Sequence, residues 1–332
     1  MKAAMLKAPG DLRVEDVPEP QPGPNEVKIK IAYCGLCGTD PESVAGHFPP
    51  FTKPYILGHE SAGTVVELGS NVTGLKVGQE VTCNFRSFCG HCYYCRNKME
   101  HYCENAVRSS GGMAEYGVFH EDMVYPLPAG ISLKIGALVE PVSVALHAID
   151  RANVYPGSSV MISGAGPIGL LLLQMAVHSG AAGVLVSEPI AEKRKLAEKL
   201  GATATIDPIK GDVMAAVEKM TEGRGFDTVI DATGRLDVAK QCIAYTARCG
   251  TVLWAAVYLA GQEVGVKPHE IMTKEISIHA NFVSPYSFIR SIAMLPRLDL
   301  EPLVTDIVPL ADIHKAFEIH EKGQAIKVLI QP

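Results

Sequence analysis

Residues 163–169 read Ser163-Gly-Ala-Gly-Pro-Ile-Gly169, and this stretch decides the fold of the chain. The four residues before it, Ser-Val-Met-Ile, predict a short buried strand, and the apolar run Leu170–Val177 after it predicts the start of a helix. The three glycines therefore spell G-x-G-x-x-G at a strand-to-helix turn, which is the context that the dinucleotide fingerprint requires. The stretch predicts a Rossmann unit that binds a dinucleotide.

Each glycine of the turn has its own physical role. Gly164 permits the tight turn, Gly166 lets a pyrophosphate approach the backbone, and Gly169 lets the helix pack closely on the strand. The free N–H groups and the dipole of the helix N-terminus then face the phosphates. A second strand, Gly183–Ser187, precedes Glu188, at the distance expected for a carboxylate that binds ribose hydroxyls. Because a carboxylate repels a 2′-phosphate, Glu188 favours NAD over NADP.

The sequence from residue 150 to residue 284 alternates strand-like and helix-like patterns, as a doubly wound parallel sheet requires. An amphipathic helix is predicted over Ala191–Leu200, between the second and third strands. We therefore predict an α/β fold with an NAD-binding Rossmann domain over residues 150–284. The expected strands are Ser159–Ile162, Val184–Ser187, Thr203–Ile206, Thr228–Asp231, Thr251–Ala256 and Ser277–Phe282.

Length and charge limit the possible partners. The chain has 332 residues, enough for two domains, and a net charge of -6 at pH 7. A net negative charge argues against nucleic acid, because that affinity rests largely on basic contacts to phosphates. No apolar run reaches membrane-spanning length, and the N-terminus lacks the apolar core of a secretory signal. We expect a cytoplasmic protein without a nucleic-acid or membrane partner.

The nine cysteines are unevenly placed. In a long chain without a secretory signal, clustered cysteines indicate a metal or catalysis before disulfides. Four of them follow the spacing C-x2-C-x2-C-x7-C, and four thiolates from one short loop suit a closed tetrahedral zinc site that supports folding. We predict a structural zinc lobe over about residues 83–103, held by Cys89, Cys92, Cys95 and Cys103.

The next chemical feature is Gly58-His59-Glu60, which is followed by glycines at 63 and 69 and by Val72. This stretch resembles the signature of the zinc-containing medium-chain alcohol dehydrogenases. Cys37-Gly-Thr39-Asp40 is similar to the segment that carries the family's first catalytic zinc ligand. The run Leu138–Ala148 is close to the corresponding run in sorbitol, xylitol and butanediol dehydrogenases.

The resemblance covers essentially the whole chain and implies a mostly β GroES-like catalytic domain over residues 1–149 and 285–332. In its second segment we expect helices over Phe288–Leu295 and Ile313–Glu321 and a final strand over Lys327–Ile330.

The resemblance also implies a catalytic zinc, which polarises an alcohol oxygen as a Lewis acid. Cys37 and His59 are the expected ligands. Glu60 and Glu140 are the third ligand and its exchangeable neighbour, in an order that the sequence leaves open. Thr39 matches the hydroxyl that takes the alcohol proton in the family.

Two departures from the family pattern bear on the reaction. Glu42 stands where many relatives have a histidine that completes proton transfer, and His47 is a candidate substitute. The run Gly111–Tyr116 resembles a family strand. The linker from Cys103 to this run is shorter than in the polyol and butanediol dehydrogenases. Arg108 in this linker is a candidate contact for an anionic group, and a solvated loop charge is the alternative interpretation.

The predicted cofactor contacts lie at the carboxyl ends of the strands. By resemblance, the backbone around Ala256–Tyr258 and Asn281–Val283 borders the nicotinamide. Lys193 and Arg194 lie on a predicted helix that carries several charges. Either cation could bind a 2′-phosphate; the alternative is that both simply belong to the solvent-exposed face of this helix. The predicted cofactor-binding residues are Gly164, Gly166, Pro167, Ile168, Gly169, Glu188, Lys193, Ala256, Val257, Tyr258, Asn281, Phe282 and Val283.

We therefore predict a zinc- and NAD-dependent oxidoreductase that converts a secondary alcohol, a polyol or a vicinal diol, into a ketone. One alternative is a threonine-type or sugar-acid dehydrogenase of the same family. Another is a catalytically silent dinucleotide sensor or scaffold, against which the set Cys37, Thr39, His59, Glu60 and Glu140 counts. The family implies a homo-oligomer, a dimer or a tetramer. The substrate, its stereochemistry, the physiological direction and the subunit number stay open.

Overall fold

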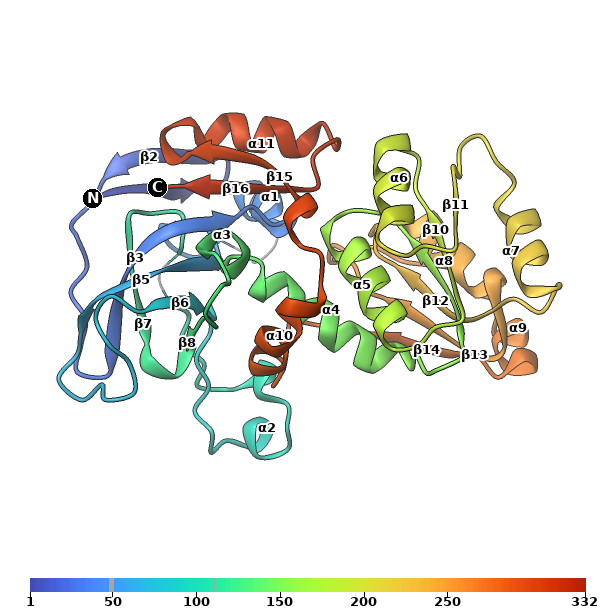
Figure 1. Ribbon diagram of the computed structural model, residues 1–332, viewed down its shortest axis with the longest axis horizontal. Coiled ribbons are helices and arrows are strands. Elements are labelled where there is room, and N and C mark those ends of the chain that lie inside the picture. The colour runs from blue at the N-terminus through green and yellow to red at the C-terminus, as the bar shows by residue number, and fades with distance from the viewer. Residues whose placement is uncertain (48–50, 110) are drawn as a thin grey trace. The chain divides into compact units, whose positions relative to one another are not determined.

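The computed structural model describes residues 1–47, 51–109 and 111–332. The chain divides into two compact units, drawn in Figure 1. One unit comprises Met1–Ser143 and Pro285–Pro332, and the other comprises Val144–Ser284. The two units are described in turn.

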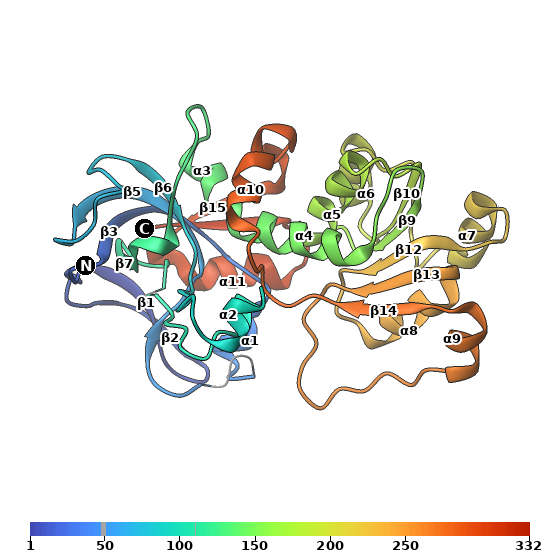
Figure 2. The same cartoon turned by 90° about the horizontal axis from the view of Figure 1, so that it is seen from below.

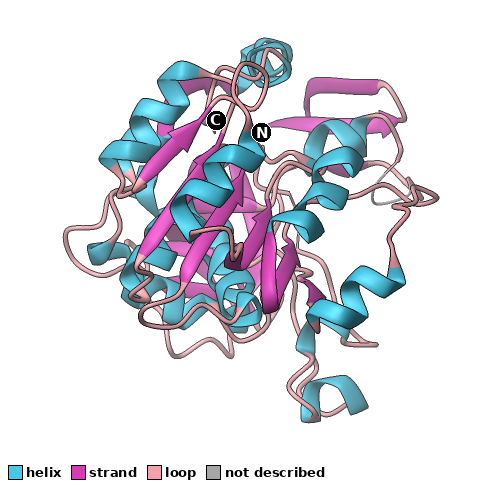
Figure 3. Ribbon diagram, turned by 90° about the vertical axis from the view of Figure 1, so that its right-hand side faces the viewer, coloured by secondary structure: helices cyan, strands magenta, loops and turns pink. Residues whose placement is uncertain are grey.

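The second unit is built on a six-stranded parallel sheet with the strand order β11-β10-β9-β12-β13-β14. In chain order this is 3-2-1-4-5-6, the doubly wound arrangement whose order reverses between β9 and β12. Helices α5 and α6 lie on one face of the sheet and α8 lies on the other (Figure 2). Figure 3 shows the strands side by side between these helices. The strands are β9 (Ser159–Ser163), β10 (Gly183–Ser187), β11 (Ala204–Ile206), β12 (Phe226–Asp231), β13 (Thr246–Trp254) and β14 (Ser277–Ala280). The helices are α5 (Pro167–His178), α6 (Ala191–Lys199), α7 (Val213–Thr221), α8 (Leu236–Tyr245) and α9 (Pro268–Lys274).

The sequence of α5 explains why it is buried. Pro167 occupies the first turn, where a missing N–H costs nothing, and its fixed φ favours the helix start. Gly169 and the seven residues that follow it are buried. A helix that is apolar on every side is expected in the interior of a protein, and here it packs on β9 and β10.

The first unit is mostly β. A seven-stranded sheet has the order β15-β16-β3-β5-β6-β8, with β7 paired to β3, and a three-stranded sheet has the order β2-β1-β4. Its strands are β1 (Lys2–Ala8), β2 (Asp11–Asp16), β3 (Glu26–Gly35), β4 (Tyr55–Ile56), β5 (Glu60–Leu68), β6 (Glu80–Cys83), β7 (Tyr116–His120), β8 (Val124–Pro126), β15 (Val304–Pro309) and β16 (Lys327–Gln331). Its helices are α1 (Thr39–Val44), α2 (Tyr93–Arg96), α3 (Leu133–Gly136), α10 (Phe288–Met294), α11 (Ile313–Glu321) and the 3-10 turns η1 (Glu100–Tyr102), η2 (Glu121–Met123), η3 (Leu295–Arg297), η4 (Glu301–Leu303) and η5 (Leu310–Asp312). Helix α4 (Val139–Ala152) contains the boundary between the two units.

One expected strand is wrong. The run Gly111–Tyr116 is irregular, and β7 begins only at Tyr116. The backbone of Met113 bonds singly to two different neighbours: its N–H donates to Leu57 O, and its carbonyl accepts from Ala4 N–H. These single bonds to two partners do not form a ladder, so the segment joins β1 to the loop before His59 without extending a sheet.

Among the described helices, none has the length and apolarity needed to cross a bilayer.

Candidate active site

Three side chains of the first unit converge where β3 ends and β5 begins. Cys37 lies between β3 and α1, His59 precedes β5, and Glu60 is the first residue of β5. The antiparallel register of β3 and β5 pairs Gly35 with Glu60, which brings these segments together. One donor atom from each of Cys37, His59 and Glu60 lies within 4.8 Å of the other two. A thiolate, an imidazole and a carboxylate are the donor types that zinc takes in proteins, so this set fits the expected metal.

Asp40 supports two members of this group. It is 2% exposed, and its Oδ2 accepts a hydrogen bond of 2.8 Å from the backbone N–H of Cys37. Its Oδ1 lies 3.7 Å from Nδ1 of His59, which leaves Nε2 of the ring for a metal. Burial raises the pKa of Asp40, and the opposite charge of His59 partly offsets that rise. Burial alone lowers the pKa of His59, but Cys37 and Asp40 raise it well above its ordinary value.

Glu60 is tied to a lysine that the sequence analysis did not select. Lys327 Nζ donates to Glu60 Oε1 at 2.8 Å, to Glu60 Oε2 at 2.7 Å and to Leu36 O at 3.1 Å. Both side chains are buried, with exposures of 3% and 1%. Burial lowers the pKa of Lys327, but the negative charges of Glu60, Cys37 and Glu140 and the hydrogen bond to Glu60 together raise it above its ordinary value. The signal in the sequence is that Lys327 directly precedes the apolar run Val328–Ile330, which is buried. A lysine in a buried strand predicts a partner of opposite charge, because buried lysines are rare unless they are paired.

Gly35 makes room for this ion pair. A Cβ built on Gly35 would lie 1.8 Å from Oε2 of Glu60. Any side chain at position 35 would therefore displace the Glu60 carboxylate. The glycine in Cys34-Gly35-Leu36 is required by this close approach, which no local sequence pattern indicates.

Glu140 lies apart from the group of three. It occupies the first turn of α4 and is 5% exposed. Its pKa is raised to about 7, mainly by burial; the charge of His59 opposes this rise and the charge of Glu60 adds to it. Glu140 is therefore electrostatically coupled to the group, but its oxygens are not among the donor atoms within 4.8 Å of one another.

The predicted proton-transfer residues follow Cys37 in the sequence, on α1 and just after it. Thr39 is the first residue of this helix. Glu42, in the same helix, accepts a hydrogen bond of 3.0 Å at Oε2 from Nδ1 of His47. The two candidates for proton exit, which the sequence analysis treated separately, are thus joined to each other.

The four cysteines of the lobe form a second group. Their sulfur atoms lie within 4.8 Å of one another and fit a tetrahedral zinc site. Backbone N–H groups of the loop donate to these sulfurs: Cys89 N to Cys103 Sγ and Cys92 N to Cys89 Sγ, each at 3.3 Å. A backbone hydrogen bond from His91 is the main cause that lowers the pKa of Cys89 to about 5. The lobe is anchored by Tyr286, whose hydroxyl donates to Cys95 O at 3.0 Å.

In the second unit, the glycine turn has the geometry of a phosphate cradle. Gly164 has φ +98°, and a Cβ on Gly169 would lie 2.0 Å from Gly164 O. A Cβ on Gly166 would meet nothing within 4 Å, so this position leaves space for a bound group. Glu188 follows β10, is 6% exposed, and accepts hydrogen bonds from Ala165 N at 2.8 Å and Ile190 N at 3.0 Å.

The remaining predicted cofactor residues follow other strands of the same sheet. Tyr258 comes after β13, and its hydroxyl donates to Asp231 Oδ2 at 2.5 Å. Asn281 follows β14, and its buried Oδ1 has no hydrogen-bond partner within residues 1–47, 51–109 and 111–332. This orphaned acceptor and the open space at Gly166 fit a bound dinucleotide. Pro167, Ile168, Lys193, Ala256, Val257, Phe282 and Val283 also belong to this unit.

Comparison with known proteins identifies the family of the chain. Residues 23–129 match the family "Alcohol dehydrogenase GroES-like domain", and residues 167–296 match "Zinc-binding dehydrogenase". The chain is 32% identical to a sorbitol dehydrogenase of Halalkalibacterium halodurans, over 97% of this chain and 96% of that protein. The chain belongs to the zinc-containing medium-chain alcohol dehydrogenase family. It is an oxidoreductase that acts on CH–OH groups.

Two further relatives span the full length of this dehydrogenase. It is 32% identical to a D-arabitol-phosphate dehydrogenase of Enterococcus avium, over 100% of this chain and 97% of that protein. It is also similar to the structure of a zinc-binding dehydrogenase of Sinorhizobium meliloti bound to NADP. That comparison has a TM-score of 0.94 and 33% identity, and covers 100% of this chain and 99% of the other.

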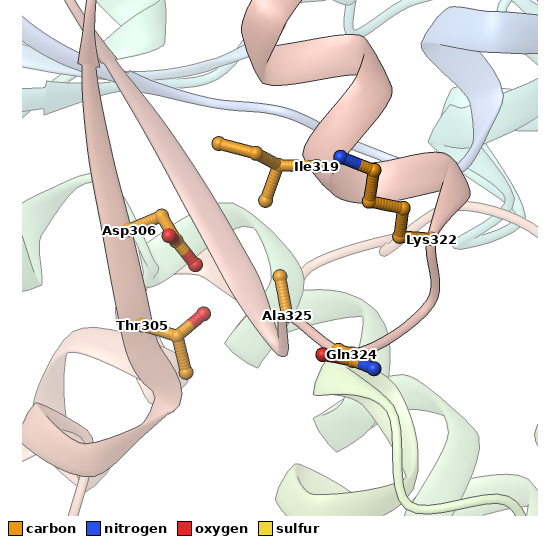
Figure 4. Close-up of a pocket in the computed structure, with 6 residues that line it drawn as sticks. All are labelled: Thr305, Asp306, Ile319, Lys322, Gln324 and Ala325. Carbon is orange, nitrogen blue, oxygen red and sulfur yellow. The ribbon is translucent and has the colours of Figure 1, made fainter.

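The dehydrogenase also has a pocket beside its C-terminal strand, with a volume of about 320 Å³ (Figure 4). Thr305 and Asp306 line it from β15, Ile319 from α11, and Lys322 from the end of that helix. None of the predicted site residues lines this pocket, so it has no part in the proposed chemistry.

Proposed function

We propose that this dehydrogenase oxidises a secondary alcohol, a polyol or a vicinal diol, to a ketone and transfers the hydride to NAD. The observation that carries the proposal is the convergence of Cys37, His59 and Glu60 within 4.8 Å. These side chains come from two strand ends, and their donor types suit zinc. A family member that had lost turnover would have no need to keep them together.

Cys37 and His59 would hold the catalytic zinc, which supplies a Lewis acid for the alcohol oxygen. Glu60 is the nearer carboxylate, but both of its oxygens bond to Lys327, so it can coordinate only by sharing an oxygen with this lysine. Glu140, with its pKa raised to about 7 by burial, is the exchangeable neighbour in this proposal.

The proton of the alcohol leaves through side chains of α1 and through His47, which follows this helix. The Thr39 hydroxyl accepts it from the substrate, and the hydrogen-bonded pair of Glu42 and His47 passes it on to solvent. Both members of this pair are partly exposed, which suits an exit. The pair thereby replaces the single histidine that many relatives have at this point.

The proposal favours NAD over NADP. Glu188 is buried at the end of β10, where its negative charge repels a 2′-phosphate. Arg194, one candidate for a phosphate contact, already donates to the carbonyls of Glu188 and Pro189 and lies 3.5 Å from Asp207. One similar structure is bound to NADP. The preference of this dehydrogenase is tested by measuring turnover of the same alcohol with NAD and with NADP.

The substrate class rests on the relatives. The names sorbitol dehydrogenase and D-arabitol-phosphate dehydrogenase both refer to polyols. We also propose a cytoplasmic location, and we expect a homo-oligomer because the family is dimeric or tetrameric. Light scattering of the purified protein tests the subunit number.

The decisive experiment is NADH production over a panel of sorbitol, xylitol, 2,3-butanediol, threonine and sugar acids, with and without a zinc chelator. We expect at least one alcohol to be oxidised, and we expect the chelator to abolish this turnover. Turnover of threonine alone would favour the threonine-type alternative. If the protein holds two zinc ions and binds NAD but produces no NADH with any compound of the panel, the proposal is contradicted and a sensor or scaffold is favoured.

A further inference from the structure

Two arginines face each other on the segments that enter and leave the zinc lobe. Arg86 and Arg108 form an isolated antiparallel backbone bridge. The bridge is fixed on both sides, because Ser87 N donates to Val107 O at 2.9 Å and Ser109 N donates to Phe85 O at 3.0 Å. The backbone of Arg108, in the short linker after Cys103, is therefore hydrogen-bonded to the segment that holds Arg86, before Cys89.

Neither guanidinium has an acidic partner in the part of the chain that the structure describes. Other arginines do: Arg13 pairs with Asp11, and Arg235 pairs with Asp237 at 3.0 Å. The Nε atom of Arg86 is buried and has no hydrogen-bond partner among the described residues. Burial is the main cause that lowers the pKa of Arg86, and the like charge of Arg108 lowers it further. A buried donor without an acceptor, next to a second cation, costs free energy unless an anion binds there.

Arg86 is adjacent in sequence to a residue that contacts the group of Cys37, His59 and Glu60. Phe85 immediately precedes Arg86, and its ring lies edge-on to the His59 ring with centroids 5.4 Å apart. The ring that touches a proposed metal ligand and the unpaired guanidinium thus belong to neighbouring residues. Both arginines and the group belong to the first unit.

We propose that Arg86 and Arg108 form an anion-binding subsite, which takes a phosphate or carboxylate group of the alcohol substrate. This inference rests on the proposed function and narrows its substrate class, a polyol or a vicinal diol, to polyol phosphates or sugar acids. Guanidinium groups suit both anions, because their planar forks donate two parallel hydrogen bonds to two oxygens. The anion supplies the acceptor that Arg86 Nε lacks, and its charge relieves the repulsion between the two cations.

The first test measures binding without turnover. Inorganic phosphate is titrated calorimetrically into the zinc-loaded protein and into its Arg86→Gln, Arg108→Gln and Arg13→Gln variants. Arg13 is the matched control, since it is exposed on β2 and already paired with Asp11. We expect each subsite variant to bind phosphate about tenfold to a hundredfold more weakly, the usual effect of losing a charge-assisted hydrogen bond, and the control to match the parent. Equal phosphate binding in all four proteins would overturn the subsite, because the anion would then sit elsewhere, for example on the metal.

The second test compares matched substrates. D-Arabitol against D-arabitol phosphate examines the phosphate, and sorbitol against gluconate examines the carboxylate. We expect kcat/KM to favour one anionic member, and we expect this preference to fall about tenfold or more in Arg108→Gln and to return in part in Arg108→Lys. Because Arg108 is exposed, this variant is expected to fold even if Arg86→Gln does not.

The two proposals fail in distinguishable ways. If arginine-dependent phosphate binding persists while no alcohol is oxidised, the proposed function fails and the subsite stands. If alcohols are oxidised and the anionic preference is the same in Arg108→Gln as in the parent, the subsite is overturned and the proposed function stands.

Discussion

Cys34 and Cys37 lie three residues apart, but only the surroundings of Cys37 suit a zinc ligand. Cys34 is fully buried on β3, and burial raises the pKa of its thiol, so it stays protonated. Cys37 lies beyond the strand end beside His59 and Glu60. We predict that Cys37→Ala loses one zinc per chain and all turnover while NAD still binds. The control, Cys34→Ala, keeps both zinc ions. Elemental analysis and an activity assay check this, and unchanged activity in Cys37→Ala would rule out the metal mechanism.

The second prediction for a single residue concerns the contribution of the buried Lys327–Glu60 ion pair to stability. Lys327→Met leaves the Glu60 carboxylate buried without its partner, which costs about 3–5 kcal/mol in comparable pairs. We therefore expect a clear drop in the midpoint of thermal unfolding. Lys2→Met is the control, because the Lys2–Asp16 pair is exposed and worth at most about 1 kcal/mol.

A third variant separates charge from packing in the same pair. In Glu60→Met/Lys327→Met no charge is left unpaired, so we expect the midpoint to recover part of the way. If the single and double variants unfold at the same temperature, the loss comes from packing rather than from the unpaired carboxylate.

At the scale of the elements, local patterns were sufficient for most of the second unit and for the C-terminus. Helix α11 runs over Ile313–Glu321 as predicted, and β9 differs from its prediction by one residue. Strand β13 starts at Thr246 rather than Thr251 because its pairing with β12 continues across a register shift. A bulge of this kind depends on the neighbouring strand, which a local pattern does not contain.

The site shows the same division between local and long-range information. The spacing of the four cysteines and of Gly58-His59-Glu60 was readable from the chain. The partner of Glu60 was not, because Lys327 is 267 residues away in sequence. Arg86 was missed for a related reason, since only its bridge to Arg108 makes it part of a pair.

The glycine turn before α5 gives the prediction at this scale. A Cβ on Gly169 would lie 2.0 Å from Gly164 O, whereas a Cβ on Gly166 would meet nothing within 4 Å. We predict that Gly169→Ala forces the helix off the turn and destabilises the fold by about 1–3 kcal/mol or more. Gly166→Ala should keep the thermal midpoint and weaken NAD binding, because its methyl group occupies the space intended for the pyrophosphate. Equal midpoints for the two variants would contradict the close packing of α5.

At the scale of the whole molecule, the two expected ligands belong to different units. All the residues of both cysteine-containing metal groups lie in the first unit, and all the predicted NAD contacts lie in the second. Each unit has its own apolar core: β1, β3, β5 and α11 contribute to one, and β9, β12 and β13 contribute to the other. Removing one ligand should therefore loosen one unit and leave the interior of the other intact.

Hydrogen–deuterium exchange measured by mass spectrometry tests this separation. Zinc removal should speed exchange in peptides of the lobe, because N–H groups such as those of Cys89 and Cys92 donate to sulfurs that the metal holds in place. Peptides of β9 and β12 should exchange as before, since their amides are bonded within the parallel sheet. Addition of NAD should instead slow exchange at residues 164–169. If zinc removal speeds exchange equally in β12 and in the lobe, the units do not unfold independently, and the metal then supports the cofactor domain as well as its own.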